Sequence, residues 1–445
     1  MFFKNYDQII SNGQTSNLKK RREDVLEILT SAIDAVNPYN AVKSVFNNDK
    51  IVIESEEIDL TNFDNVYLVG FGKASVGMAR AVCDCTSIYS GAIVTNDSSD
   101  KLEKDGIDVF VGGHPLPNID CIKGTEKILD VAGLCGENDL LIVLISGGGS
   151  ALLCKPRICL EDLQKTTDLL LGSGADINEI NTIRKHLSYV KGGQLAGYTK
   201  GVVISLVISD IVGDPLEFIA SGPTFADSTT YSDAKAVFEK YDLWKNIPIK
   251  VRKVIEDGVS GNIDETPKCD SPIFKDVFNY IVANNKIACQ AAIDKANKIG
   301  YNSMIVTASL TGEAKDIGRY LADKVINYVN SDDTFAFISG GETTVTIRGN
   351  GRGGRNQELV LGAVENISDK EIVFSSFATD GIDGKSDAAG AIADGYTKSR
   401  GKKIDLNPTD FLDDNNSYEY FKKLGDLFFT GPSGTNVMDI QVILV

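Results

Sequence analysis

The chain has 445 residues, more than one ordinary hydrophobic core supports, so its length favours two domains. Its 42% hydrophobic and 24% charged residues are typical of globular proteins, and the net charge of −17 argues against a main role in binding nucleic acids or membranes. We find no signal-peptide pattern, no apolar run long enough to cross a bilayer, and no CxxC pair among eight scattered cysteines. These features predict a cytoplasmic protein with reduced thiols.

Short apolar runs alternate with longer amphipathic stretches along the first 260 residues. Four of these runs are rich in Val and Ile and end in Gly, Ser, Asn or Asp, as buried strands do: 66–70, 92–95, 140–146 and 202–208. Stretches of helical length lie at 73–83, 161–171 and 187–197. This order predicts a Rossmann-like α/β fold with a largely parallel sheet, in which ligands bind at the carboxyl ends of the strands.

The segment 258–272 has little apolar content and several turn residues, so we expect a linker there. The alternation then resumes, with strand-like runs at 278–283, 303–307, 334–339 and 372–377 and helix-like stretches at 286–298 and 313–329. We therefore expect a larger N-terminal α/β domain over residues 1–260 and a smaller C-terminal α/β domain over residues 273–445.

A glycine-rich run, VGFGKASVG, joins a predicted strand to a predicted helix at residues 69–77. Backbone amides and the positive end of a helix attract anions at such a junction, and Lys73 adds a full charge there. The spacing matches neither the dinucleotide fingerprint nor the P-loop. Lys73 is therefore a candidate anion ligand, with tight packing around a solvated lysine as the alternative.

The most apolar strand-like run ends in SGGGSA at residues 146–151. Three consecutive glycines cost backbone entropy, and their usual benefit is the close approach of a ligand to exposed N–H groups. Gly147, Gly148 and Gly149, flanked by the hydroxyls of Ser146 and Ser150, favour phosphate binding over a plain turn.

Basic side chains cluster near residue 190. Arg184, Lys185, His186 and Lys191 fall within eight positions, and a solvated helix face is the alternative to a binding site. His186 by itself would more often be a hydrogen-bonded structural residue than a catalyst. The other histidine, His114, lies in the loop GGHPLPN.

Arginines and aspartates mark two glycine-rich segments of the C-terminal half. Residues 340–358 hold three arginines, including Arg355, among six glycines, which suits a mobile loop closing on phosphate or carboxylate; a hairpin tip is the alternative. Aspartates on turns could hold magnesium or could simply form the turns, and these are Asp210, Asp380, Asp383 and Asp387.

Taken together, these motifs resemble the glycerate 2-kinase (type II glycerate kinase) family, with its MOFRL-type C-terminal domain. Eight segments carry the resemblance in the family's order, from residue 69 to residue 437: VGFGKASVGMARAV, GGHPLPN, LISGGGSALL, NTIRKHLSYVKGGQLA, SDIVGDPLEFIASGPT, GGETTVTIRGNGRGGRNQELVL, TDGIDGKSDAAGA and TGPSGTNV. Ser433 and Lys385 are slight departures from the expected pattern.

The resemblance implies an active site in the cleft between the two domains, ATP as phosphoryl donor, Mg²⁺ or another divalent cation, and D-glycerate converted to 2-phosphoglycerate. The family's lysine of the first glycine turn falls on Lys73, and its arginine of the GGRNQE stretch falls on Arg355. Both would stabilise the transferring group. Ser146–Ser150 would bind nucleotide phosphates, and Asp387 is the candidate general base. The substrate carboxylate would meet His114, Arg184 or Lys191, and the metal would meet Asp210, Asp380 or Asp383.

Two other functions remain open. An NAD(P)-dependent hydroxypyruvate reductase suits an α/β chain but lacks the dinucleotide fingerprint. A non-catalytic sensor of phosphate ligands would need the phosphate turns but neither the aspartate turn nor the arginine loop. A homo-oligomer is one of the states that the sequence allows.

Overall fold

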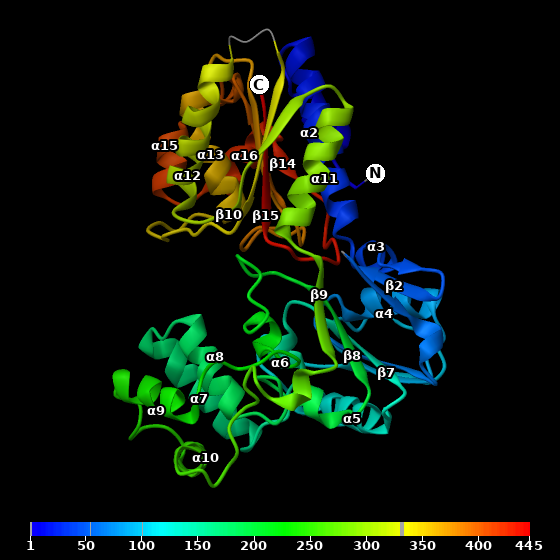
Figure 1. Ribbon diagram of the computed structural model, residues 1–445. Helices are drawn as coiled ribbons and strands as arrows, with labels where there is room; N and C mark the ends of the chain where they lie inside the picture. Colours follow the sequence, from blue (N-terminus) through cyan, green and yellow to red (C-terminus); the bar gives the residue numbers. More distant parts are fainter. Residues whose placement is uncertain (1, 54, 100, 330–332) are drawn as a thin grey trace. The chain divides into compact units, whose positions relative to one another are not determined.

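The computed structural model describes residues 2–53, 55–99, 101–329 and 333–445 (Figure 1). The chain forms two compact units. Unit 1 comprises residues 1–37, 210–213 and 283–445. Unit 2 comprises residues 38–209 and 214–282. This division differs from the expected domains of 1–260 and 273–445, because the N-terminal segment belongs with the C-terminal half and the boundary falls at 283.

Unit 2 is built on a six-stranded sheet with the order β6-β5-β4-β7-β8-β9. Its strands are β4 (Val66–Phe71), β5 (Ser90–Thr95), β6 (Ile107–Val111), β7 (Leu140–Ile145), β8 (Val202–Ile208) and β9 (Val277–Ala283). β4 to β8 pair in parallel, which confirms the predicted fold and its four strands. β9 extends this sheet, although the sequence suggested that this run begins the second domain. A small antiparallel sheet contains β1 (Phe46–Asn47), β2 (Lys50–Ile53) and β3 (Glu56–Asp59).

The helices of unit 2 include the two expected at 73–83 and 161–171, together with several that the sequence analysis did not name. They are α3 (Pro38–Lys43), α4 (Ser75–Cys85), α5 (Ile119–Leu134), α6 (Gly149–Leu152), α7 (Leu160–Ser173), α8 (Ile177–His186), α9 (Tyr231–Lys240) and α10 (Ile249–Val259). The helix expected over 187–197 is wrong: α8 ends at His186, and only a short 3₁₀ turn follows at Gln194–Tyr198. Gly192 and Gly193 have φ values of 59° and 81°, which are incompatible with a continuous right-handed helix.

Unit 1 holds a mixed six-stranded sheet with the order β10-β11-β15-β12-β13-β14. The strands are β10 (Asn302–Leu310), β11 (Phe335–Gly341), β12 (Val373–Ala378), β13 (Gly390–Asp394), β14 (Leu427–Phe428) and β15 (Asp439–Leu444). The final strand, β15, runs antiparallel to both of its neighbours, β11 and β12. It therefore occupies the middle of the sheet.

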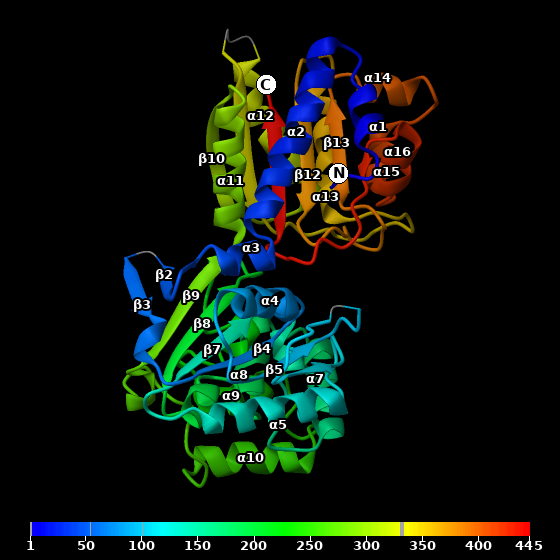
Figure 2. The same cartoon turned by 90° about the vertical axis from the view of Figure 1, so that its right-hand side faces the viewer.

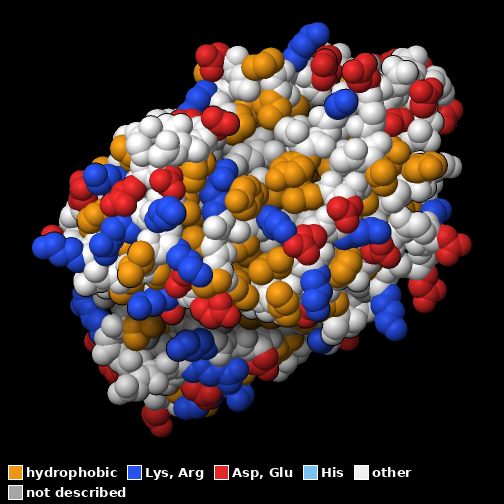
Figure 3. Space-filling view, turned by 90° about the horizontal axis from the view of Figure 1, so that it is seen from below, with side chains coloured by type: hydrophobic (Ala, Val, Ile, Leu, Met, Phe, Trp, Pro, Cys, Tyr) orange, Lys and Arg blue, Asp and Glu red, His pale blue; other side chains and the backbone are white. Residues whose placement is uncertain are grey.

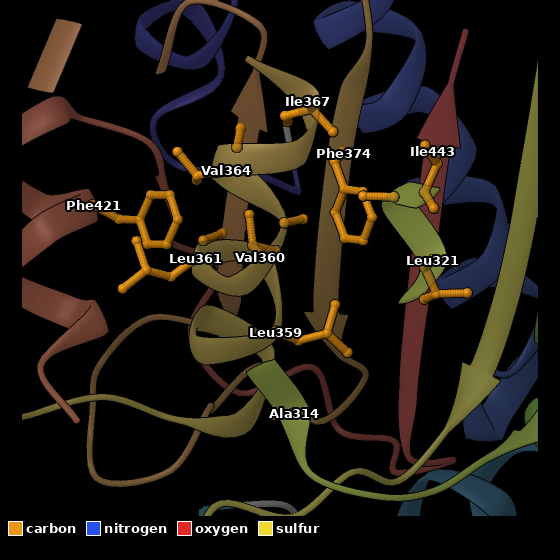
Figure 4. Packing of buried hydrophobic residues seen from close by; sticks show 14 of the residues in the cluster. Ala314, Leu321, Leu359, Val360, Leu361, Val364, Ile367, Phe374, Phe421 and Ile443 are labelled. Carbon is orange, nitrogen blue, oxygen red and sulfur yellow. The ribbon is translucent and has the colours of Figure 1, made fainter. Parts of the chain in front are cut away.

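Helices cover both faces of this sheet (Figures 1 and 2). One face carries α2 (Ser16–Ala35) and α11 (Asn285–Lys298), and the other carries α12 (Ala314–Val325) and α13 (Arg355–Ile367). The remaining helices are α1 (Tyr6–Ser11), α14 (Thr397–Lys402), α15 (Pro408–Asp413) and α16 (Ser417–Leu424). The buried core under α13 includes Leu359, Val360, Phe374 and Ile443 (Figure 4).

A buried ion-pair network ties α2 to unit 1. The guanidinium of Arg22 is fully buried, with Nε 2.7 Å from Asp394 and Nη1 2.9 Å from Asp426. One helical face of α2 also buries apolar side chains such as Leu26 and Leu29. These contacts explain why the N-terminal segment belongs to unit 1. In the part of the chain that the structure describes, no helix is long and apolar enough to span a membrane.

Candidate functional site

Two glycine turns meet at the carboxyl edge of the unit 2 sheet. β4 and β7 pair in register, with Phe71 opposite Ile145, so the turns that follow them lie together. The Lys73 amide donates to the Gly147 carbonyl at 2.9 Å. A Cβ on Gly72, where φ is 122°, would lie 2.2 Å from the Ser146 hydroxyl, so only glycine fits there. The close packing of Gly72 against Ser146 therefore explains why a glycine follows strand β4 in the sequence.

The two predicted phosphate serines differ in their surroundings. Ser146 is 1% exposed, and its hydroxyl accepts a hydrogen bond from the Ala74 amide at 3.1 Å. Ser146 therefore holds the two turns together. Ser150 lies beyond the turn, 2.9 Å from the Ser221 hydroxyl, and lines a pocket.

Lys73 and His114 approach the same glycine. A Cβ on Gly148 would lie 3.1 Å from the His114 ring and 3.3 Å from the Lys73 side chain. Partial burial, together with the charge of Lys73, lowers the pKa of His114 below its ordinary 6.5. The imidazole is therefore neutral at pH 7 and offers hydrogen bonds, whereas Lys73 offers charge.

The basic cluster divides into two faces. Arg184 and Lys191, separated by seven positions, both line the pocket, as do Leu187 and Ser188 between them. Lys185 faces away and its Nζ lies 2.6 Å from the buried carboxylate of Asp227.

His186 is a structural residue. Its Nδ1 lies 2.7 Å from the Thr182 carbonyl, and its Nε2 lies 3.3 Å from a Glu265 carboxylate oxygen. Its ring also packs edge-on against Tyr231. The structural interpretation favoured for this histidine therefore agrees with its contacts.

The pocket that Ser150 lines is one of several in unit 2; it has a volume of about 190 Å³ and brings together His114, Gly148, Ser150, Arg184 and Lys191. None of the described residues that line it is Asp or Glu. This is notable because the whole chain carries 17 excess negative charges. The volume is below the roughly 300–1,000 Å³ of drug-sized sites, so the pocket suits a small anion.

Two of the cations that line the pocket, Arg184 and Lys191, have no carboxylate partner among the described residues. Within the described residues the Arg184 guanidinium forms no hydrogen bond or ion pair, and burial lowers its pKa. Lys191 is 6% exposed and donates to the Leu153 carbonyl. Burial, reinforced by the charge of Arg184, lowers the pKa of Lys191 to about 8. A bound anion would satisfy both groups.

Arg355 is the first residue of α13 and is held by two carboxylates. Its Nε and Nη2 bind the two oxygens of Asp439 at 2.6 and 3.0 Å, and its Nη1 binds Glu342. Burial raises the pKa of Asp439 to about 7, and the attraction of Arg355 opposes this rise. Sequence analysis missed both partners; their only signal is that Glu342 directly follows the glycine pair ending β11.

The glycines before Arg355 allow close packing rather than a free loop. A Cβ on Gly349 would lie 2.4 Å from the Asp414 backbone, and one on Gly351 would lie 2.5 Å from the same residue. The Arg352 carbonyl also accepts from the Tyr418 amide at 3.0 Å. These contacts differ from the expected mobile loop, because the segment lies on the chain around residues 414–418.

Asp383 caps a helix instead of presenting free metal ligands. It is 1% exposed, and its carboxylate accepts four hydrogen bonds from the amides and side chains of Asn356 and Gln357, at 2.9–3.2 Å. These residues begin α13, so Asp383 satisfies the otherwise unpaired N–H groups of that helix. The candidate metal ligand is thus fully engaged by protein donors.

The other aspartates do not assemble a metal site. Asp380 accepts from the Ile382 amide at 3.0 Å within its own turn, and Asp210 belongs to the short piece of unit 1 at 210–213. Among the described residues no three His, Cys, Asp or Glu side chains gather closely enough to hold a metal ion. The expectation that one or more of Asp210, Asp380 and Asp383 meets a metal ion stays a prediction.

Asp387 is a weak candidate for the general base. Its Oδ1 accepts from the Tyr418 hydroxyl at 2.7 Å and lies 3.1 Å from Arg352. The Tyr418 hydrogen bond, with the charge of Arg352 in addition, lowers the pKa of Asp387. A carboxylate with a lowered pKa accepts a proton poorly at neutral pH, which argues against the predicted role.

Comparison with known proteins gives two family models and full-length relatives. Residues 24–256 match a domain of unknown function, DUF4147, and residues 335–439 match the MOFRL family. The chain is 46% identical to a glycerate 2-kinase of Pyrococcus horikoshii, over 95% of this chain and 97% of that protein. A crystal structure of glycerate kinase from Thermotoga maritima superposes with a TM-score of 0.87 at 38% identity, over 96% and 100% of the two chains. A putative hydroxypyruvate reductase of Agrobacterium vitis is 38% identical over 85% and 86%.

Proposed function

This chain belongs to the glycerate 2-kinase family, and we propose that it transfers the terminal phosphoryl group of ATP to the 2-hydroxyl of D-glycerate, giving 2-phosphoglycerate and ADP. The observation that carries this proposal is the pocket in which Arg184 and Lys191 meet the glycine turn at Gly148 without any lining carboxylate. Both substrates are anions: D-glycerate is a small carboxylate, and ATP ends in a phosphate group. Such a pocket suits them in an otherwise acidic protein.

The acceptor carboxylate is proposed to bind between Arg184, which is half-buried, and Lys191, which is buried, because both cations lack a protein carboxylate. Neutral His114 would hydrogen-bond a hydroxyl of the same molecule. The N–H groups of Gly148 and Gly149 and the hydroxyl of Ser150 would hold phosphate oxygens. Holding both reactants in this way removes much of the entropic barrier to their reaction.

Lys73 and Arg355 are proposed to stabilise the phosphoryl group in transfer. The transition state spreads charge over three equatorial oxygens, so fixed cations contribute more than covalent chemistry does. Lys73 is exposed next to Gly148, and a lysine ammonium can follow the moving group. Arg355 keeps two of its five N–H donors outside its contacts with Asp439 and Glu342.

Mg²⁺ is proposed to enter with ATP, because such ions are commonly bound by one or two carboxylates together with the substrate phosphates. Asp210 and Asp380 remain the candidates, whereas the oxygens of Asp383 are already used. Chelation should abolish turnover and added Mg²⁺ should restore it. Full activity in the presence of excess chelator would contradict a metal requirement.

The decisive experiment measures ADP release with and without D-glycerate and identifies the product by ³¹P NMR. Glycerate-dependent ADP release with 2-phosphoglycerate as product supports the proposal. The sequence similarity to a putative hydroxypyruvate reductase gives the experiment a second arm, in which hydroxypyruvate is supplied with NADH or NADPH. Oxidation of either cofactor without glycerate-dependent ADP release would overturn the kinase assignment.

The face shown in Figure 3 mixes basic and acidic side chains, with apolar patches between them. It presents no continuous basic surface of the kind that nucleic acids bind.

A further inference from the structure

The two carboxylates that hold Arg355 differ sharply in their environment. The side chain of Asp439 is 1% exposed, whereas that of Glu342 is 43% exposed. Asp439 engages Nε and Nη2 through two parallel hydrogen bonds, and Glu342 engages only Nη1. The parallel pair fixes the plane of the guanidinium, which a single contact to an exposed side chain does not do.

Asp439 is itself held in a fixed place. It is the first residue of β15 and lies opposite Gly341 of β11 and Ala378 of β12. Its carbonyl also accepts a hydrogen bond from the Asn285 side chain at 2.8 Å. Two strands and a helix therefore determine where the carboxylate lies.

The next residue of the helix reinforces this arrangement. Asn356 donates to Asp383 at 3.2 Å and accepts from the Ser376 hydroxyl, and its side chain also bonds Asp439. The backbone of Arg355 is thus fixed by the start of α13, and its guanidinium is held by Asp439 of β15. One N–H group on Nη1 and one on Nη2 remain outside these contacts.

We propose that Asp439 is a positioning residue, which orients the guanidinium of Arg355 so that its remaining N–H groups are available to the phosphoryl group. Glu342 occupies one donor in a contact that exposure makes exchangeable. This inference rests on the proposed kinase function and on the role of Arg355 in it. It adds a residue from the last strand of the chain, which none of the recognised sequence motifs includes.

The test combines variants of both residues in the full chain. Asp439→Asn should lower kcat about tenfold or more, because a misplaced catalytic group loses rate. The KM values for ATP and glycerate should change less than about twofold, since Arg355 acts in the transition state. In an Arg355→Ala background the same substitution should have no further effect on kcat, because the group it positions is gone.

Chemical rescue separates positioning from a structural role. Guanidinium ion, added to Arg355→Ala at concentrations too low to unfold the protein, should bind Asp439 and restore part of kcat in a saturable way. The Arg355→Ala/Asp439→Asn variant should show no such rescue. This comparison does not require the single Asp439→Asn variant to fold, because the double variant removes both charges of the pair.

A matched control is Asp394→Asn, which removes a carboxylate from the buried pair with Arg22 in the same unit. It should lower the melting temperature and leave kcat unchanged. Equal rescue with and without Asp439, or an equal loss of kcat in both backgrounds, would overturn the inference. Normal turnover in Arg355→Ala would instead contradict the role of Arg355 in the proposed function.

Discussion

Single residues divide the charge at the unit 2 pocket and at the adjoining glycine turn into distinct tasks. Lys73 is exposed at the glycine turn, Lys191 is buried, and His114 is neutral at pH 7. Lys155 also lines the pocket, but its charge is paired with Glu126. A cation without a carboxylate partner attracts an arriving anion more strongly than a paired one does. Substitutions of the unpaired cations should therefore lower activity most.

Lys73→Ala tests the most exposed of these cations. We expect kcat to fall about 10²–10³-fold, because a donor aimed at developing charge is lost. The fold should be intact, since the Lys73 side chain makes no ion pair within the described residues. Steady-state kinetics and thermal unfolding measure both effects. Lys155→Ala is the control and should retain most of its turnover; a similar loss in both variants would point to a general charge effect.

The pH dependence of kcat/KM for glycerate tests Lys191. Its pKa of about 8 means that the side chain is charged at pH 7 and loses its proton as the pH rises through 8. We therefore expect kcat/KM, which reports the free enzyme, to fall above pH 8. Lys191→Met should have a low value without this step, whereas Lys155→Met should keep it. An unchanged step in Lys191→Met would assign the titration elsewhere.

Sequence alone located the pocket residues but could not separate their faces. Arg184 and Lys191 stood out because they are basic residues in an acidic chain, and so did Lys185 and His186. Lys185 and His186 differ from the pocket residues because they contact Asp227 and Glu265. These two acids are distant in sequence and meet the basic side chains only after folding. Partners of that kind leave no local pattern.

Among the elements, the first turn of α13 has a partner that the sequence interpretation did not give it, the carboxylate of Asp383. The turn around residue 383 was interpreted as a possible magnesium site, because aspartates and glycines suit both metals and turns. Asp383 instead accepts hydrogen bonds from the first residues of α13. A cap that lies 26 positions after the residue it bonds, beyond the far end of the helix, cannot be recognised from the usual capping pattern.

Asp383→Ala should therefore destabilise unit 1 without changing the response to magnesium. Removing the carboxylate leaves buried donors of Asn356 and Gln357 unsatisfied, which costs about 2 kcal/mol or more. Denaturant unfolding measures the loss, and a magnesium titration of kcat measures the metal response. Asp380→Ala is the comparison on the same turn, with an exposed hydrogen bond to Ile382. A shifted magnesium requirement in Asp383→Ala would restore the metal interpretation.

For the whole molecule, the path of the chain determines which pieces can fold. Length and composition correctly suggested two α/β units, and the alternating runs identified most of their strands. They did not show that residues 1–37 join unit 1, because an amphipathic helix fits either sheet equally well by its pattern. The buried pairing of Arg22 with Asp394 and Asp426 places the N-terminal helix in unit 1, and it links positions more than 370 residues apart.

Fragments test this division. We expect residues 283–445 alone to remain unfolded, because Asp394 and Asp426 would be buried without Arg22, and breaking such a pair costs about 3–5 kcal/mol. The missing helix α2 also takes away six large buried side chains, each worth about 1.5–3 kcal/mol: Leu18, Val25, Leu26, Ile28, Leu29 and Ile33. This loss alone equals the whole stability of an ordinary domain, about 5–15 kcal/mol.

Joining residues 1–37 to 283–445 through a flexible Gly-Ser linker should restore a cooperative unfolding transition. A linker of about 20 residues spans about 25 Å on average and leaves α2 free to reach its place beside α11. Circular dichroism and thermal unfolding would compare this chain with 283–445 alone. The same linked chain carrying Arg22→Ala is the control and should lose most of the gain, since Asp394 again lacks its cation and Asp426 keeps only its pair with Arg400. Cooperative folding of 283–445 without α2 would show that the N-terminal segment is only an attachment to unit 1.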